Sequence, residues 1–329
     1  MQGLLRGYAV AMTPALPHDG LCLGGNVFGW TADEDTSFAL LDDFVASGGR
    51  MIDTADSYMA RAEGNSGGES ETVIGRWLAR GGRRDDVVIA TKVGSWEQRK
   101  GLSPDNIRAA CDDSLRRLQT DHIDLYYAHR DDPDTPQEDY VAAFDELVRA
   151  GKVRAVGASN FDADRLACAL EIADKHDLTR FTAVQPHYNL VERDYERELA
   201  PLVEREGLVC YPYFGLAKGF LTGKYRPATG GGAAAEVDSG ASSGAMAGAR
   251  AEGARAYLDD RGVALLGVLD EIAAAHDVPV AAVSLAWLAA QPTVGAPIAS
   301  GRTTKQLSEI LPAVGLRLSD DELARLSKA

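Results

Sequence analysis

The chain has 329 residues, of which 45% are hydrophobic and 25% are charged. These proportions are typical of globular proteins and exclude disordered, collagen-like and coiled-coil classes. The 34 Lys and Arg residues against 49 Asp and Glu residues give a net charge of −15, which opposes attraction to nucleic acid or to an anionic membrane. One anionic ligand remains compatible with this charge, because a few local cations and backbone N–H groups can hold a phosphate.

The cysteines and the start of the chain indicate the compartment. The four cysteines are widely spaced and form no Cys-x-x-Cys pair, so neither a disulfide framework nor a metal site is expected. The apolar run after Arg6 is too short for a signal peptide, and no stretch of 18 apolar residues occurs. We therefore expect a cytoplasmic protein that does not enter a membrane.

Short apolar runs alternate along the chain with longer segments of helical period, which is typical of parallel strands joined by crossover helices. A first helix is expected over residues 36–47. Ser103 and Pro104 predict the capped start of a helix at 104–118, and Thr135 with Pro136 repeats that signal. A later helix is expected over 262–276. The predicted strands, in chain order, are 21–23, 50–53, 87–92, 123–129, 153–159, 183–185, 208–213 and 296–300.

Eight β/α units predict a (β/α)8 TIM barrel that covers residues 1–329 as a single domain. The rival fold, a doubly wound sheet, usually carries a Gly-x-Gly-x-x-Gly turn after its first strand, and residues 23–29 do not match that spacing. One segment, residues 227–253, is rich in Gly, Ala and Ser, and we expect it to be a flexible loop on the active face of the barrel. A cover over the ligand and a tolerated surface insertion both remain open for it.

Nearly every predicted strand is followed by a polar side chain at its carboxyl end, where barrel enzymes build their active sites. Taken singly, each residue has a structural explanation, such as a turn cap or a buried histidine. Together, an aspartate, a lysine and a histidine after three successive strands, with Tyr58 in the loop after the first, indicate a functional site. The residues at these ends are Asn26, Asp53, Lys92, His129, Ser159, Asn160, Gln185, Tyr213 and Ser300.

Lys92 has two chemically distinct roles open to it in such a site. A neutral Lys92 would form a Schiff base with a carbonyl substrate, as in an aldolase-like lyase. A charged Lys92 would lower the pKa of Tyr58 and make the phenol a proton donor. Bringing that pKa from about 10 toward neutrality requires about 4 kcal/mol, which an adjacent cation in a pocket of low dielectric constant can supply. Asp53 favours the second role, because a nearby carboxylate keeps the lysine charged.

Six runs, in this order along the chain, resemble motifs of the aldo-keto reductase superfamily: residues 53–58 (DTADSY), 90–94 (ATKVG), 124–129 (DLYYAH), 157–160 (GASN), 185–190 (QPHYNL) and 221–225 (LTGKY). The resemblance covers residues 20–326, and the runs 67–71 and 131–133 resemble the bacterial branch. It implies a barrel that binds a nicotinamide cofactor and transfers a hydride to a small aldehyde or ketone.

The resemblance also implies roles for the residues at the strand ends. Tyr58 would be the general acid, Lys92 would lower its pKa, Asp53 would pair with Lys92, and His129 would orient the carbonyl oxygen. Ser159, Asn160 and Gln185 would hold the carboxamide of the nicotinamide, and Tyr213 would stack on its ring. Other residues expected to bind the cofactor are Asn26, Phe214, Gly215, Leu216, Lys224, Ser300, Arg302, Gln306 and Glu309. Trp30 and Trp96 follow strands at the same face and would either wall the substrate pocket or serve packing alone.

The cofactor preference is predicted from local charge. Lys224, Arg302 and Lys305 are the cations available to the 2′-phosphate that distinguishes NADPH from NADH, so we expect NADPH to be preferred and NADH to serve less well. Two further functions remain: a nucleotide-sensing regulatory subunit of the same fold, and the Schiff-base lyase that uses Lys92. The intact set of ionisable residues argues against the sensor. The sequence makes no prediction of oligomeric state.

Overall fold

The computed structural model of the protein describes residues 16–18, 20–81, 84–226 and 252–329, and its sheet confirms the predicted barrel. Eight strands pair side by side in the order β10-β1-β2-β3-β6-β7-β8-β9, and each neighbouring pair in this order is parallel. Every predicted strand has its counterpart. The strands are β1 (Cys22–Gly24), β2 (Met51–Asp53), β3 (Val88–Val93), β6 (Ile123–Ala128), β7 (Val153–Ser159), β8 (Phe181–Gln185), β9 (Val209–Cys210) and β10 (Ile298–Ala299).

The two ends of this sheet meet through backbone hydrogen bonds, which close the barrel. Cys210 N donates to Thr293 O at 2.8 Å, Gly295 N donates to Cys210 O at 2.8 Å, and Ile298 N donates to Pro212 O at 2.9 Å. Both strands at this seam are shorter than the predicted runs 208–213 and 296–300. Pro212 and Pro297 lie within those runs, and since proline has no N–H it cannot continue a ladder.

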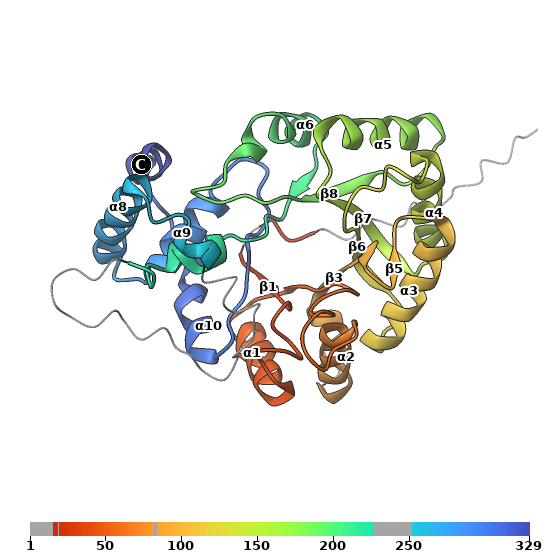
Figure 1. Ribbon diagram of the computed structural model, residues 1–329, viewed down its shortest axis with the longest axis horizontal. Coiled ribbons are helices and arrows are strands. Elements are labelled where there is room, and N and C mark those ends of the chain that lie inside the picture. Colours follow the sequence, from red (N-terminus) through yellow and green to blue (C-terminus); the bar gives the residue numbers. More distant parts are fainter. Residues whose placement is uncertain (1–15, 19, 82–83, 227–251) are drawn as a thin grey trace, which may run out of the picture.

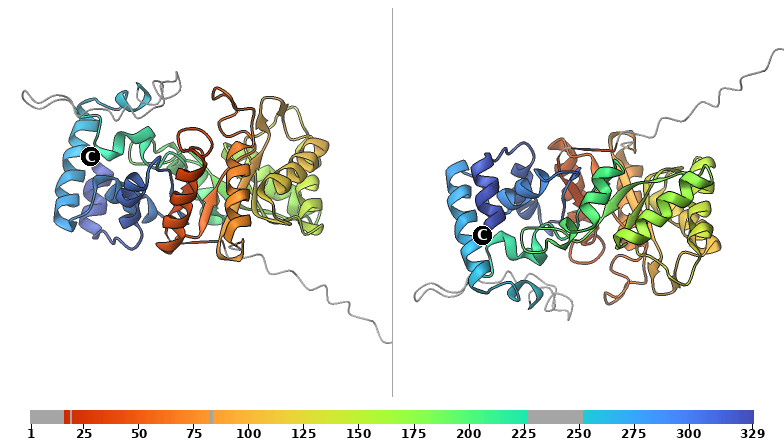
Figure 2. Two further views of the ribbon diagram at one scale, coloured as in Figure 1. Left: turned by 90° about the horizontal axis from the view of Figure 1, so that it is seen from below. Right: turned by 90° about the horizontal axis from the view of Figure 1, so that it is seen from above.

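Helices surround the strands in the view along the barrel, and α8 with the C-terminal helix stands outside that ring at one end (Figures 1 and 2). The α-helices of the described residues include α1 (Glu34–Ala46), α2 (Glu69–Gly81), α3 (Pro104–Leu118), α4 (Gln137–Arg149), α5 (Ala163–Lys175), α6 (Leu199–Arg205), α8 (Asp260–His276), α9 (Val280–Ala289), α10 (Thr304–Ile310) and α11 (Asp320–Lys328). Short 3-10 helices occupy η1 (Arg84–Asp86), η2 (Asp194–Glu196), η3 (Ala217–Thr222) and η4 (Leu311–Ala313).

One of the two helix caps predicted from the sequence is present. Ser103 caps α3 as predicted, with its Oγ accepting from Asn106 N at 3.4 Å. The predicted cap at Thr135 is wrong: α4 begins after Pro136 without a side-chain cap. The Thr135 hydroxyl instead donates to Asp132 at 2.7 Å, because that carboxylate folds back over the same loop. A small antiparallel hairpin, β4 (Ser95–Trp96) and β5 (Arg99–Lys100), was not predicted.

The interior of the barrel is filled by a separate apolar cluster whose members alternate with outward-facing residues along the strands. This cluster is closed at one end by Leu16 and is lined by small side chains, among them Ala90, Ala155 and Ala183. The larger core lies between the strands and the surrounding helices. All four cysteines are unpaired, and Cys22 and Cys210 are buried in these cores as expected for small apolar residues.

Two further expectations concern the loop and the membrane. The predicted flexible loop, residues 227–253, falls almost wholly outside the described residues. Among the helices described, none alone is long and apolar enough to cross a membrane, and α8 and α9 reach that length and composition only together, across a bend of 97°.

Candidate active site

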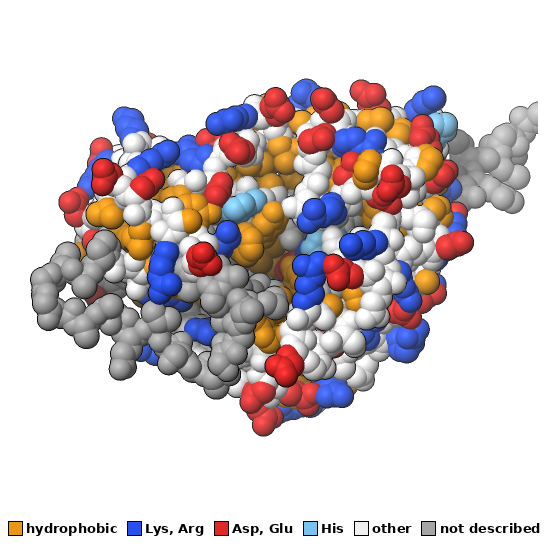
Figure 3. Space-filling view, in the orientation of Figure 1, with side chains coloured by type: hydrophobic (Ala, Val, Ile, Leu, Met, Phe, Trp, Pro, Cys, Tyr) orange, Lys and Arg blue, Asp and Glu red, His pale blue; other side chains and the backbone are white. Residues whose placement is uncertain are grey.

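The polar site sits directly above the apolar filling of the barrel because strand side chains alternate with a period of two. On each of six strands, a residue of the inner apolar cluster is followed two positions later by a predicted site residue. The view along the barrel in Figure 3 shows a hollow at the centre, with hydrophobic side chains inside it. The pairs are Met51 and Asp53, Ala90 and Lys92, Tyr127 and His129, Ala183 and Gln185, Tyr211 and Tyr213, and Ile298 and Ser300.

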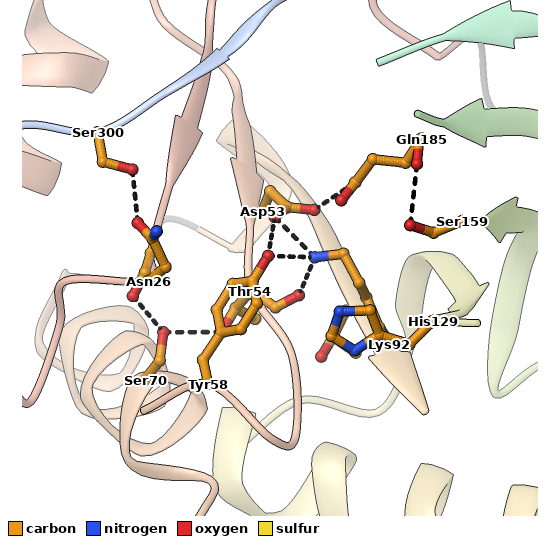
Figure 4. Close-up of polar contacts among 12 residues, drawn as sticks. Asn26, Asp53, Thr54, Tyr58, Ser70, Lys92, His129, Ser159, Gln185 and Ser300 are labelled. Carbon is orange, nitrogen blue, oxygen red and sulfur yellow. Dashed lines mark hydrogen bonds and ion pairs between the residues drawn. The ribbon is translucent and has the colours of Figure 1, made fainter. Parts of the chain in front are cut away.

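Asp53, Tyr58 and Lys92 meet at one point in the barrel (Figure 4). Lys92 Nζ donates to Asp53 Oδ2 and to Tyr58 Oη, each at 2.7 Å, and to the carbonyl oxygen of Thr54, also at 2.7 Å. Tyr58 Oη in turn donates to Asp53 Oδ2 at 2.9 Å. The side chain of Lys92 is 0% exposed and that of Asp53 1%. Three acceptors match the three N–H donors of an ammonium group, so this geometry suits a charged lysine.

Burial dominates the titration of the two groups that would handle protons. Desolvation raises the pKa of Tyr58 well above 10, and the charge of Asp53 and its hydrogen bond raise it further. The direction is opposite to the lowering expected from Lys92, because the loss of water around the phenol outweighs the adjacent ammonium. Burial also lowers the pKa of Lys92, and Asp53 opposes that shift. Tyr58 therefore carries its proton at neutral pH, as a proton donor must.

His129 follows β6 and faces Tyr58, with the two rings edge to face at 6.0 Å between centroids. Its Nδ1 lies 3.4 Å from the Ser57 hydroxyl. Burial lowers the pKa of His129 well below 6.5, and the charges of Lys92 and Arg130 lower it further. The imidazole is thus neutral at pH 7 and has a single N–H to donate. Ser57 was not predicted as a site residue, although it lies in the same sequence run as Tyr58.

The residues expected to hold a carboxamide form a continuous network that ends on Asp53. Tyr213 Oη donates to Asn160 Oδ1 at 2.8 Å, and Asn160 Nδ2 donates to Ser159 Oγ at 3.0 Å. Ser159 Oγ donates to the backbone oxygen of Gln185 at 2.9 Å, and Gln185 Nε2 donates to Asp53 Oδ1 at 2.8 Å. Asn160 has a left-handed backbone, with φ of 54°, which asparagine tolerates better than most residues.

These groups fit a nicotinamide by their chemistry. Two side-chain amides and a hydroxyl can exchange hydrogen bonds with a primary carboxamide, and they lie beside the half-buried ring of Tyr213, which offers an aromatic face. His187, to which the sequence assigned no role, stacks on the ring of Tyr213. The two ring centroids are 5.4 Å apart, and the rings are 12° from parallel. Phe214 packs edge-on against both rings. The sequence signal that could have identified His187 is its position two residues after Gln185, the last residue of β8.

A second group of predicted residues follows the strands β1, β9 and β10. Ser300 Oγ donates to Asn26 Oδ1 at 2.7 Å (Figure 4), and the backbone N–H of Arg302 donates to Gln306 Oε1 at 2.8 Å. Lys224, an exposed residue after η3, lies with its ammonium 5.0 Å from the ring centre of Tyr225. Within the described part of the chain, no hydrogen bond or ion pair joins Lys224, Arg302 or Glu309 to one another. Gly215 and Leu216 lie between Phe214 and η3, where a side chain at Gly215 would meet Leu285 of α9.

The two predicted wall residues lie in loops at the same face. Trp30 is half-buried in the turn after β1. Trp96, in β4, donates its indole N–H to the Ser66 carbonyl at 2.9 Å, with the guanidinium of Arg117 5.8 Å from its ring centre. Their role at a substrate pocket stays a prediction. In the described residues, no cluster of three or more His, Cys, Asp or Glu side chains is arranged to hold a metal ion.

Comparison with known proteins gives one consistent result. The model of the Aldo/keto reductase family matches residues 20–329. The uncharacterized oxidoreductase YrpG of Bacillus subtilis is 35% identical over 93% of this chain and 90% of its own length. The protein tas of Escherichia coli is 33% identical over 94% of this chain and 95% of its own. The norsolorinic acid reductase stcV of Emericella nidulans is 33% identical over 97% of this chain and 80% of its own length.

Proposed function

Because this chain belongs to the aldo/keto reductase family, we propose that it reduces an aldehyde or ketone with NADPH, with Tyr58 as the proton donor. The family's members are NAD(P)H-dependent oxidoreductases that act on small-molecule carbonyl compounds. The observation that carries the finer proposal is the meeting of Asp53, Tyr58 and Lys92 beneath the neutral imidazole of His129. When bound, the reduced nicotinamide would supply the hydride that the carbonyl carbon accepts.

The chain's own residues would act on the carbonyl oxygen. His129 and Tyr58 would both donate hydrogen bonds to it, and this would fix the carbonyl against the Tyr213 side of the barrel. As negative charge develops on the oxygen, the Tyr58 proton moves to it and the phenolate left behind is stabilised by Lys92 Nζ, 2.7 Å away. Asp53 keeps Lys92 charged throughout and holds Gln185 at 2.8 Å.

The first prediction concerns Tyr58→Phe, which keeps the ring and removes the proton. We expect kcat to fall about 100-fold or more with little change in cofactor affinity, as loss of a positioned general acid would give. The measurement is loss of NADPH absorbance with a panel of aldehydes and ketones. Tyr213→Phe serves as the control, since it removes another phenol of the same network and should raise the KM for cofactor more than it lowers kcat. Near wild-type turnover of Tyr58→Phe between about pH 6 and pH 9 would assign the proton to another group, with His129 next in line.

The alternative Schiff-base lyase is tested on the same residue set. The three acceptors around Lys92 Nζ favour the ammonium, which is not a nucleophile. Borohydride added with a carbonyl substrate should therefore leave the mass of the protein unchanged. A substrate adduct on Lys92 would reject the reductase proposal. NADPH oxidation by any aldehyde in the panel would argue against a purely nucleotide-sensing subunit.

A further inference from the structure

Arg130, the residue directly after His129, is a cation beside the proposed reaction centre, and no anionic partner for it is found among the described residues. It is exposed, and in the described part of the chain it makes no hydrogen bond or ion pair. The two aspartates that follow it are engaged elsewhere. Asp131 binds Arg165 through two bonds of 2.7 and 2.9 Å, and Asp132 accepts from Leu102 N at 2.7 Å.

Three other cations of the neighbouring strands and loops have close anionic partners. Lys92 is paired with Asp53, Arg61 with Glu97, and Arg99 with Asp113. In a chain with 49 acidic residues against 34 basic ones, an uncompensated arginine at this position is not a consequence of composition. Figure 3 shows Lys and Arg side chains beside the central hollow.

Arg130 follows His129 at the carboxyl end of β6, on the face where the other predicted site residues lie. Its positive charge adds to the lowering of the pKa of His129, and it opposes the rise that burial causes in the pKa of Tyr213. Under the proposed function, these rings flank the substrate carbonyl and the nicotinamide. The nicotinamide end of the cofactor carries no phosphate, whereas the residues expected to meet the phosphates, such as Arg302, follow the strands β1, β9 and β10. The partner that Arg130 lacks is therefore expected from the substrate.

We propose that Arg130 binds a carboxylate on the substrate, so that the protein reduces aldehydes or ketones that also carry a carboxylate. This inference rests on the proposed function. The planar guanidinium has paired N–H donors that match the two oxygens of a carboxylate, and such charge-assisted pairs are stronger than neutral hydrogen bonds. Recognition at this point would place the carboxylate at the rim and the carbonyl beneath His129.

The test compares 4-carboxybenzaldehyde with its uncharged methyl ester, methyl 4-formylbenzoate, in the wild-type protein and in variants. We expect the wild type to prefer the acid, and Arg130→Gln to lower the ratio of kcat/KM for acid over ester about 10- to 100-fold, mainly through KM. Arg130→Lys should restore part of the ratio, since it keeps the charge and loses the paired donors. Lys175→Gln, an exposed cation at the end of α5, removes the same charge far from the mouth and should leave the ratio unchanged.

Four results would overturn the inference. An equal ratio in wild type and Arg130→Gln would remove the carboxylate from this residue while leaving the reductase proposal intact, provided that the ester is reduced. A rise in the KM for NADPH with both substrates would assign Arg130 to the cofactor. A fall in the ratio in Lys218→Gln but not in Arg130→Gln would move the anion site to the η3 side. No NADPH oxidation with either aldehyde would reject the proposed function and this inference together.

Discussion

The hydroxyl hydrogen of Tyr58 points to Asp53 Oδ2, 2.9 Å away, while Lys92 Nζ donates to the same hydroxyl at 2.7 Å. Lys92 cannot turn away, because its remaining N–H donors are held by Asp53 and by the Thr54 carbonyl. The phenol can rotate about its C–O bond, however, so a carbonyl oxygen would compete with Asp53 for its proton. Proton donation at this site thus requires a change in hydrogen-bond partner and no movement of the backbone.

Arg302 supplies the prediction on cofactor choice. Its backbone N–H is held by Gln306 Oε1 at 2.8 Å, which fixes the turn at the start of α10. If its guanidinium binds the 2′-phosphate, Arg302→Ala should weaken NADPH about 10-fold or more and leave NADH nearly unchanged, as loss of a charged contact would give. The KM for each cofactor, measured with one aldehyde, checks this, with the exposed Lys328→Ala at the far end of α11 as control. Equal losses for both cofactors would mean that Arg302 supports the turn alone.

At the residue scale, the sequence predicted which side chains lie together but not how they titrate. Asp53, Lys92 and His129 were found from their positions after strands, because a barrel brings those ends to one face. The direction of the shift in the pKa of Tyr58 depends on how completely water is excluded from the phenol, and the sequence alone does not give this burial. Ser57 and His187 were missed for a related reason, since their partners, His129 and Tyr213, are distant in sequence.

The loop between β2 and α2 presents an unusual packing problem at the scale of elements. Asp56, in this loop, is 0% exposed, and neither of its carboxyl oxygens has a hydrogen-bond partner. Burial raises the pKa of Asp56 to about 7; Glu71 of α2 adds to the shift, and Arg117 of α3 opposes it. The loop that carries Tyr58 is therefore packed over a carboxyl group that is more stable there with its proton.

This packing predicts a pH dependence of stability. The carboxyl has a pKa of about 7 in the folded protein against a reference value of 3.8. The folded state therefore keeps a proton that the unfolded chain has lost, and stability falls as the pH rises between these values, by about 4 kcal/mol in all. Asp56→Asn should remove this loss, so its free energy of unfolding should gain on that of wild type as the pH rises.

Urea unfolding of both proteins between about pH 4 and pH 8 measures the difference. The exposed Asp134→Asn in the loop before α4 is the matched control, and its difference from wild type should not change with pH across that range. Parallel curves for Asp56→Asn and wild type would show that the buried carboxyl is already compensated in solution.

The elements themselves were predictable where the chain follows regular periods. The barrel strands β1, β2, β3, β6, β7 and β8 lie within one or two residues of the predicted apolar runs, because inner strands of a barrel are buried on both sides. The hairpin β4–β5 was missed since its residues, Ser95 to Lys100, are polar except for Trp96 and form no apolar run. The Thr135 cap failed because the sequence shows a suitable hydroxyl but not its competitor, Asp132.

The length of strand pairing varies around the barrel. β6 and β7 are six and seven residues long and pair along most of their length, whereas β9 and β10 have two residues each. Among the described residues, three backbone hydrogen bonds join the two sides of the seam between β9 and β10. Tyr211 Oη also donates to Pro17 O, in the segment before β1, at 2.7 Å. Local opening should therefore begin at this seam.

Hydrogen exchange would detect this difference. The amides of Cys210, Gly295 and Ile298 should exchange sooner than those of Leu125 and Val156 in the β6–β7 pair, since they belong to the shorter ladder. Mass spectrometry of peptides from the two regions, with and without NADP, is the measurement. Cofactor should slow exchange at the seam more than elsewhere. Uniform protection around the barrel would contradict the uneven pairing.

The seam has a consequence for how ligand and fold depend on each other. Tyr213 and Phe214 follow β9, while Ser300 and Arg302 follow β10. The residues expected to hold the cofactor therefore lie on both sides of the seam between these two short strands. A dinucleotide bound to both sides would hold the two strands together. Because such a ligand binds only the closed barrel, the stability of the barrel rises with ligand concentration. On heating, the barrel without cofactor would then open first at the β9–β10 seam, which is where the cofactor is expected to bind.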